Sequence, residues 1–148
     1  MKLDPLIVCT TFLGAACSRR MKAELLPRKR GWIQAPYQLD VHRRELVLQA
    51  MGEACSHRGW KLFAAHVRTN HVHAVVRAGV RPEIVMNCFK SYASRALNRS
   101  GFDPPNRKRW TRHGSTRYLW KEEDISAAIS YVVHEQGEPM HVLDTSAP

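Results

Sequence analysis

The chain has 148 residues, 44% of them apolar and 24% charged, which suits one compact domain and excludes an intrinsically disordered polymer. Lysine and arginine total 23 against 13 acidic residues, so the formal net charge is +10 at pH 7. A domain this basic typically binds a polyanion, most often a nucleic acid, although a solvated basic surface would give the same count.

No apolar run reaches the roughly 20 residues that a membrane-spanning helix needs, and the N-terminus lacks the pattern of a signal peptide. The four cysteines include no C-x-x-C pair, so we expect reduced thiols in a cytoplasmic protein.

The N-terminal third of the chain predicts one strand and one helix. Residues 6–13 are rich in β-branched and aromatic side chains, which indicates a strand. Residues 14–39 hold six basic side chains and two prolines, and we expect an irregular basic loop there. A helix is predicted over 41–57, with Asp40 as its N-cap and Gly59 closing it. Its apolar stripe is formed by Val47, Ala50, Met51 and Ala54.

The middle of the chain predicts a hairpin followed by a second helix. Two β-rich segments, 61–69 and 72–78, flank Asn70 and indicate an antiparallel pair joined by a short turn. Pro82 is a favoured first helical position. The stripe that this helix is expected to bury comprises Val85, Cys88, Phe89, Tyr92, Ala93 and Ala96, with Lys90, Ser94 and Arg95 lying away from it.

The C-terminal part predicts one more strand and one more helix. Residues 99–113 are interpreted as a basic loop, residues 115–120 as a strand, and residues 122–135 as a helix that Gly137 ends. The order of elements predicts an α+β fold: a ferredoxin-like βαββαβ sandwich with an antiparallel sheet and one added C-terminal helix. We expect residues 1–148 to form a single domain.

His71 and His73 are the sharpest chemical feature of the sequence. Alternate side chains of a strand share a face, so both imidazoles should point away from the face of Val72, Ala74 and Val76. Two imidazoles roughly 7 Å apart along one strand face can converge on one metal ion. Two unrelated surface histidines would show the same spacing, so the pattern alone does not decide between them.

Tyr131 lies beside the apolar stripe of the last predicted helix, with Glu135 one turn later and Gln136 next. A tyrosine in this place is usually an amphipathic edge residue, so it does not by itself indicate catalysis. His66, on the strand before the histidine pair, is expected to be a packing or surface residue.

Basic and aromatic residues are interleaved between residues 99 and 121. Basic groups neutralise phosphates and aromatic rings stack on unpaired bases, so this region predicts contact with nucleic acid. The alternative is a basic loop beside core aromatics, with Trp120 as the clearest candidate for the core. The side chains that we expect to contact nucleic acid are Lys90, Arg95, Arg107, Lys108, Arg109, Arg112, Arg117 and Tyr118.

Taken together, four stretches resemble the HUH single-tyrosine transposases of small bacterial insertion sequences, including the REP-associated tyrosine transposases. The stretches are NHVHAVV (70–76), FKSY (89–92), WTRHGSTRYLW (110–120) and YVVHEQG (131–137). Their order and spacing cover roughly residues 41–140, and the combination is specific where H-x-H alone is not. The resemblance implies the HUH endonuclease fold, with the tyrosine on the C-terminal helix, in agreement with the fold read from periodicity.

The resemblance also implies a mechanism. His71 and His73 would hold Mg²⁺ or Mn²⁺ together with a third ligand from the last helix, and the ion would polarise the scissile phosphate of single-stranded DNA. Tyr131 would attack that phosphorus, leaving a 5′-phosphotyrosine link and a free 3′-OH for later rejoining. Many relatives place the ligand glutamine four residues after the tyrosine. Here Glu135 holds that position, while the spacing to Gln136 resembles one branch of the family, so both stay candidates.

Partners and competing functions follow from the same resemblance. The expected partner is single-stranded DNA carrying hairpins, in a cytoplasmic, nucleoid-associated protein without a membrane partner. Whether the chain forms a homodimer, and whether Tyr131 serves its own histidines or those of a second copy, stays open. The alternative function is a non-cleaving protein, derived from such a transposase, that binds hairpins or single strands. An RNA-binding domain of the RRM type is disfavoured because its aromatic motif is missing, and a twin H-x-S/T phosphoesterase because Ala74 follows His73.

Overall fold

The computed structural model describes the backbone of residues 6–14 and both the backbone and the side chains of residues 37–145. The loop predicted over 14–39 therefore lies almost wholly outside the described residues. Among the residues that the structure describes, no helix is both long enough and apolar enough to cross a membrane.

One antiparallel sheet of five strands forms the centre of the described molecule, in the order β4-β1-β3-β2-β5. The strands are β1 (Leu6–Gly14), β2 (Lys61–Val67), β3 (His71–Ala78), β4 (Trp110–Leu119) and β5 (His141–Asp144). The helices are α1 (Val41–Arg58), α2 (Pro82–Ser100) and α3 (Glu122–His134). The first four strands, with α1 and α2 between them, form the predicted ferredoxin-like βαββαβ arrangement.

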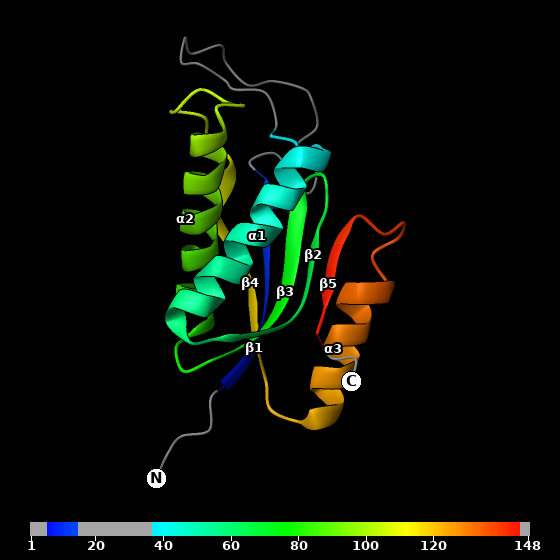
Figure 1. Cartoon of the computed structure of the whole chain (residues 1–148). Coiled ribbons are helices and arrows are strands. Elements are labelled where there is room, and N and C mark those ends of the chain that lie inside the picture. The colour runs from blue at the N-terminus through cyan, green and yellow to red at the C-terminus, as the bar shows by residue number, and fades with distance from the viewer. Residues whose placement is uncertain (1–5, 15–36, 146–148) are drawn as a thin grey trace, which may run out of the picture.

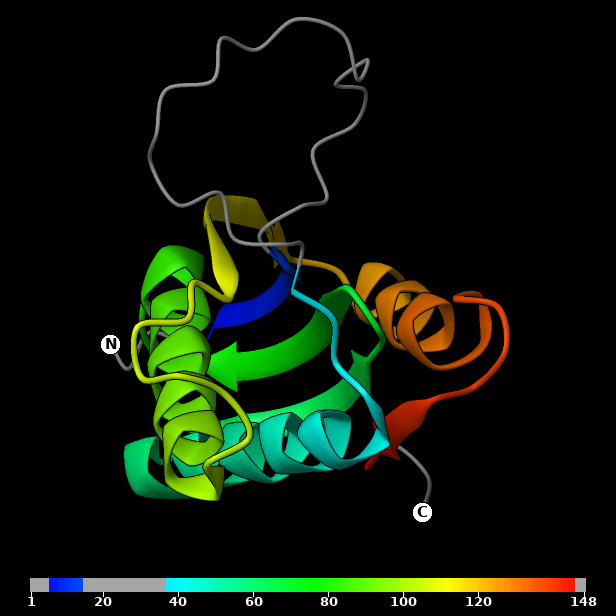
Figure 2. The ribbon, with the colours of Figure 1, turned by 90° about the horizontal axis from the view of Figure 1, so that it is seen from above.

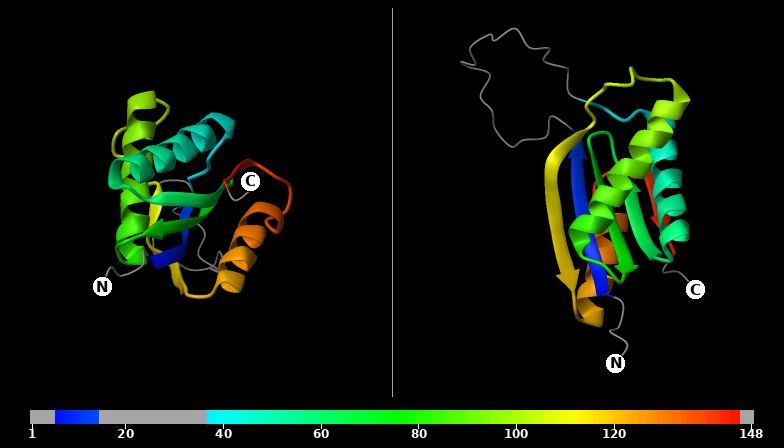
Figure 3. Two further views of the ribbon diagram at one scale, coloured as in Figure 1. Left: turned by 60° about the horizontal axis from the view of Figure 1, so that its bottom comes forward. Right: turned by 90° about the vertical axis from the view of Figure 1, so that its left-hand side faces the viewer.

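The three helices cover the sheet from opposite sides. Helices α1 and α2 lie side by side on one face, and α3 lies on the other face beside β5 (Figures 1 and 2). The added helix therefore closes a second layer over the half of the sheet that contains β2 and β3. Edge strand β4 lies at the opposite margin, next to β1 (Figure 3).

Local sequence signals explain where the first two helices begin and end. The Asp40 side chain accepts a hydrogen bond from the backbone N–H of Arg43 at 2.9 Å, which satisfies one of the free donors of the first turn of α1. Gly59 ends that helix at a positive φ of 69°, a conformation that glycine adopts without steric cost. Pro82 occupies the first turn of α2, where its missing N–H leaves no hydrogen bond unmade.

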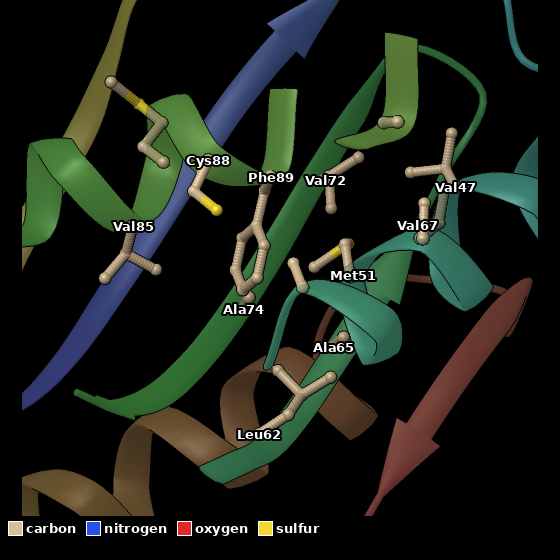
Figure 4. Close-up of a cluster of buried hydrophobic side chains, with 14 of the residues drawn as sticks. Val47, Met51, Leu62, Ala65, Val67, Val72, Ala74, Val85, Cys88 and Phe89 are labelled. Atoms are coloured by element: carbon tan, nitrogen blue, oxygen red, sulfur yellow. The ribbon is translucent and has the colours of Figure 1, made fainter. Parts of the chain in front are cut away.

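The larger core lies between the sheet and the α1–α2 layer. Phe89 of α2 is fully buried and projects towards Ala74 of β3 and Met51 of α1 (Figure 4). Its ring also meets the ring of Trp60 edge-on, with 6.4 Å between centroids. Cys88 is buried nearby, as predicted. Complete burial of an aromatic side chain between two helices and a sheet is a main contribution to the cohesion of these layers.

Most element boundaries differ from the sequence prediction by one or two residues, and three differences in the C-terminal part matter for the site. Strand β4 begins at Trp110 rather than at residue 115, because pairing with β1 extends along a polar edge strand that carries little hydrophobic signal. Strand β5 is absent from the prediction, since four residues that are at most half-buried give no clear alternation. Helix α3 ends at His134 with Glu135 as C-cap, whereas Gly137, at a φ of 80°, lies in the segment beyond.

Candidate active site on β3 and α3

The alternation of β3 directs its histidines to the face that α3 covers. Val72, Ala74 and Val76 are fully buried in the core beneath α1 and α2. His71 and His73 therefore lie on the opposite face, in the same row as Val75, which packs in the smaller core under α3. The predicted division of the two faces is confirmed.

The two rings of the histidine pair lie close together. The His71 and His73 ring centroids are 4.8 Å apart and the ring planes are nearly perpendicular, at 83°. Nδ1 of His71 is 2.6 Å from the side-chain oxygen of Asn70. An amide oxygen only accepts hydrogen bonds, so the His71 proton belongs on Nδ1 and the lone pair on Nε2. The contact with Asn70 therefore fixes one tautomer of His71. It occupies Nδ1 and leaves the lone pair of Nε2 available to a ligand.

Helix α3 brings the tyrosine of the same chain to this pair. Its apolar side packs Ala128 and Val132 against Ala64 and Val75 of the sheet. Tyr131, at the margin of that apolar side, has its ring 6.1 Å from the His73 ring in an edge-on arrangement. The tyrosine is 48% exposed, so its hydroxyl is accessible to a ligand from solvent.

The end of α3 gives Glu135 and Gln136 different surroundings. Because the helix stops at His134, the chain turns there and brings the Gln136 side chain beside the pair, where it acts to raise the pKa of both His71 and His73. Its amide nitrogen also lies 3.5 Å from the Tyr131 carbonyl oxygen. Glu135 is exposed instead. In the described part of the chain, no three His, Cys, Asp or Glu side chains gather in a way that could hold a metal.

Burial keeps both histidines of the pair neutral. It lowers the pKa of His73 to about 4, with further lowering by the nearby His71 and His66, while the Gln136 contact acts in the opposite direction. Burial also lowers the pKa of His71, and the positive charge of Arg68 lowers it further. Neutral imidazoles are the form that binds metal ions, so neither ring has to lose a proton at neutral pH.

Arg68 is a site residue that the sequence analysis did not identify. It lies in the turn between β2 and β3, and its Nη1 donates to the carbonyl oxygen of Glu138 at 3.0 Å. Its charge reaches both His71 and His73, as the lowered pKa values show. Its position in the sequence could have indicated this role. Arg68 precedes the H-x-H motif by three residues in the same hairpin, so the turn brings it close to the end of β3 that carries the motif.

Two of the predicted nucleic-acid contacts are wrong, because the structure buries them. Lys90 is only 9% exposed and donates from Nζ to the Thr111 carbonyl at 2.9 Å, tying α2 to β4, and burial lowers its pKa. Arg109 is 4% exposed and bonds to Asp103 and to Asn98. Helical periodicity placed Lys90 away from the buried stripe, but β4 covers that side of α2.

The remaining predicted contacts divide between two faces. Lys108, Arg112 and Arg117 are exposed in β4 or the loop before it, and the half-buried Arg107 lies with its guanidinium carbon 5.2 Å from the centre of the Tyr37 ring. Arg95 projects from α2, on the face opposite the histidine pair, with its guanidinium 4.5 Å from the Tyr92 ring centre.

The aromatic pair at the end of β4 is partly accessible. Tyr118 is half-buried and stacks on Trp120, with 5.3 Å between ring centroids and 27° between ring planes. Trp120 is 71% exposed, so the alternative that placed it in the core is wrong. An exposed indole stacked on a phenol provides a flat surface on which an unpaired base could stack.

The fold and the site together define a ferredoxin-like domain with an H-x-H strand facing a tyrosine-bearing helix. Residues 36–134 match the family described as "Transposase IS200 like", a region that includes His71, His73 and Tyr131. The chain therefore belongs to the IS200-like transposase family. A search of curated protein sequences gave no significant match. A REP-associated tyrosine transposase bound to a REP hairpin has a similar structure, with a TM-score of 0.61 and 12% identity over 90% of this chain and 67% of that one. At this identity the likeness shows a shared fold.

We expect an NMR titration of the histidine rings in the metal-free protein to give His73 a pKa of about 4. Because the unfolded chain binds this proton more tightly, the free energy of unfolding should fall as the pH drops from about 6.5 towards 4. Arg68→Gln should raise the pKa of His71 and of His73, since it removes a positive neighbour. A His73 that titrates at the ordinary value, or pKa values that Arg68→Gln leaves unchanged, would contradict this electrostatic description.

Proposed function

We propose that this chain cleaves and rejoins single-stranded DNA, with Tyr131 as the nucleophile beside a divalent ion held by His71, His73 and Gln136. The observation that carries the proposal is the edge-on contact of the Tyr131 and His73 rings, 6.1 Å apart, at a histidine pair that Gln136 also reaches. Membership of the transposase family and the hairpin bound by the structurally similar transposase support DNA with hairpins as the substrate.

The donor set fits a divalent ion. Two neutral imidazoles and one amide oxygen form a mixed nitrogen and oxygen set, which suits Mn²⁺ better than Mg²⁺, since Mg²⁺ prefers oxygen ligands. Asn70 holds the His71 ring with Nε2 as the lone-pair nitrogen, as expected of a residue that orients a metal ligand. When bound, such an ion supplies Lewis-acid polarisation of the scissile phosphate.

The residues of the chain would share the remaining work. The Tyr131 phenol loses its proton to solvent as its oxygen attacks the phosphorus, and a new P–O bond forms. The bond from phosphorus to the 3′ oxygen breaks, and that oxygen takes up a proton to become a free 3′-OH. Arg68 places a cation at the end of β3, where it can stabilise the negative charge of the phosphate. Attack by another 3′-OH on the phosphotyrosine reverses these bond changes and rejoins a strand.

The geometry favours a tyrosine that serves the histidines of its own chain. Helix α3 packs on the sheet that carries its own histidine pair, and the Tyr131 ring already lies against His73. Attack within one chain therefore requires no second copy, whether or not a homodimer forms. The cytoplasmic, nucleoid-associated location stays a prediction.

The exposed basic residues of β4 and its preceding loop support binding of the phosphate backbone. Lys108, Arg112 and Arg117 are accessible to the solvent, and the stacked Tyr118–Trp120 pair lies at the far end of the same strand. A protein that binds hairpins without cutting would use the same residues. The geometry at Tyr131, which binding alone does not require, favours the enzyme.

Tyr131→Phe should abolish the covalent adduct that the wild-type protein forms with labelled, hairpin-flanked single-stranded DNA in Mn²⁺. The substitution removes only the attacking oxygen from a half-exposed ring. Surface changes usually cost under about 0.5 kcal/mol. The protein should therefore stay folded, and its dissociation constant for DNA should change by no more than about twofold. Denaturing gels read the adduct and peptide mapping locates it. Tyr118→Phe is the matched control and should keep the adduct. An adduct that persists in Tyr131→Phe would overturn the assignment, and binding without any wild-type adduct would favour the non-cleaving alternative.

The salt dependence of DNA binding should change when the exposed arginines of β4 are replaced, and it should stay the same when the buried Lys90 is replaced. Replacing Arg112 and Arg117 together with Gln should reduce the slope of log K against log salt for single-stranded DNA by about 1.4, since each lost phosphate contact removes about 0.7. Lys90→Met should leave that slope unchanged, because its ammonium group is committed to a backbone carbonyl. Fluorescence anisotropy at several salt concentrations measures the slopes. The opposite pattern, in which only Lys90→Met changes the slope, would refute this surface.

A further inference from the structure

His66 is a fully buried histidine that neither the sequence motif nor the proposed mechanism uses. It lies in β2, directly opposite His73 in the antiparallel register, and on the face of the sheet that α3 covers. Apolar residues such as Ala64 and Val132 pack under α3 on this face of the sheet, while His73 lies opposite His66 on the neighbouring strand. A buried imidazole costs free energy unless both ring nitrogens are hydrogen-bonded, so an apolar residue would suit a simple packing role better.

Both ring nitrogens of His66 have partners in the segment that carries the site. The backbone N–H of Met140 lies 3.2 Å from Nε2, and Nδ1 lies 3.0 Å from the carbonyl oxygen of Val132. An N–H group can only donate, so Nε2 accepts, and the ring proton on Nδ1 is donated to Val132. The two bonds therefore require one tautomer of a neutral ring.

The Val132 carbonyl is one that the helix itself leaves without a partner. Helix α3 ends at His134, and the N–H of Glu135 bonds back to Tyr131, so the described helix provides no N–H for the next carbonyl. His66 supplies the missing donor, at the residue that follows Tyr131. The position of the last turn of α3 over the sheet therefore depends on this ring.

The Met140 bond fixes the other end of the same segment. Met140 directly precedes β5, which pairs with β2 next to His66. Between the two bonds lie residues 133–139, including Gln136. Arg68 holds the middle of this segment through its bond to the Glu138 carbonyl. One imidazole thus joins both ends of the segment that reaches the histidine pair to the strand beside that pair.

We propose that His66 is the positioning residue of the nucleophile: it clamps the end of α3 and the start of β5 to β2, and so holds Tyr131 and Gln136 against His71 and His73. This inference rests on the proposed function, because positioning matters only if Tyr131 reacts. In this role His66 acts through the main chain of Val132 and Met140 rather than on the substrate. A reacting atom displaced by about 1 Å can lose roughly 100-fold in rate, so a clamp of this kind is worth testing by kinetics.

Three substitutions separate the two bonds. The amide nitrogen of Asn occupies about the place of Nδ1, so His66→Asn keeps a donor for Val132 and loses the bond to Met140. The amide oxygen of Gln occupies about the place of Nε2, so His66→Gln keeps an acceptor for Met140 and loses the bond to Val132. His66→Leu keeps a buried side chain of similar size and removes both bonds.

The experiment measures the rate of adduct formation at saturating single-stranded DNA together with the dissociation constant of the DNA. We expect the rate to fall in the order wild type, Asn, Gln, Leu, with His66→Asn within about tenfold of wild type and His66→Leu roughly 100-fold slower. The dissociation constant should stay unchanged, since the exposed arginines that contact phosphate are untouched. If a variant only contained less folded protein, the amounts of adduct and of bound DNA would fall together. A slower rate of adduct formation with an unchanged dissociation constant therefore indicates that His66 positions the nucleophile.

A readout without metal or DNA keeps this inference separate from the proposed function. In the metal-free protein, NMR should show a nuclear Overhauser contact between the Tyr131 and His73 rings in wild type and in His66→Asn, and its loss in His66→Leu. If wild type forms no adduct but these contacts behave as expected, the proposed function fails and the clamp stands. The proposal is refuted if His66→Leu reacts at the wild-type rate and keeps the contact between the Tyr131 and His73 rings. If the leucine variant does not fold, the same result for His66→Gln refutes the proposal.

Discussion

Strand β3 lies between two helical layers, with α1 and α2 over one face and α3 over the other, and this constraint determines where its histidines lie. Its Val72, Ala74 and Val76 fill the core beneath α1 and α2, so the residues between them must face α3. A shift of one residue in its register would send His71 and His73 into the apolar core and the valines to the other side. Pairing with β1 on one side and β2 on the other prevents that shift. The histidine pair is thus positioned by packing on the opposite face of the sheet.

The second half of the site depends on how α3 ends. An apolar contact holds the helix on the sheet, but a stripe of Ala128 and Val132 alone would allow it to slide. The early stop at His134 exposes a carbonyl that a buried histidine of β2 satisfies, and the turned chain then places Gln136 at both rings of the pair. The same burial keeps the pair neutral, so the nearby cation is Arg68 rather than a protonated imidazole. Packing and electrostatics therefore have the same result: two neutral imidazoles lie next to a tyrosine and an arginine.

Much of this could be predicted from the sequence, because the strongest signals are periodic. The strict alternation of β3, the Asp40 cap and the prolines and glycines at helix ends gave the order of elements and the correct face for His71 and His73. What escaped prediction depends on contacts between distant segments. Helical periodicity predicts Lys90 to be a surface group, because it does not show that β4 covers this side of α2. His66 and Arg68 act through backbone carbonyls about 70 residues away, which no local pattern reveals. The sequence names both Glu135 and Gln136 as candidates, and it does not choose between them because no local pattern shows that the helix stops early.

The central claim is that His71, His73 and Gln136 form one divalent-metal site beside Tyr131 of the same chain. Titration of Mn²⁺ into isotope-labelled protein, followed by paramagnetic broadening of NMR signals, tests it without DNA or turnover. The account predicts that broadening starts at the rings of His71, His73 and Tyr131 and at the side-chain amide of Gln136, and that it disappears when both histidines are changed to alanine. Broadening centred on the acidic first turn of α3, at Glu122, Glu123 and Asp124, and unaffected by those changes, would contradict the account.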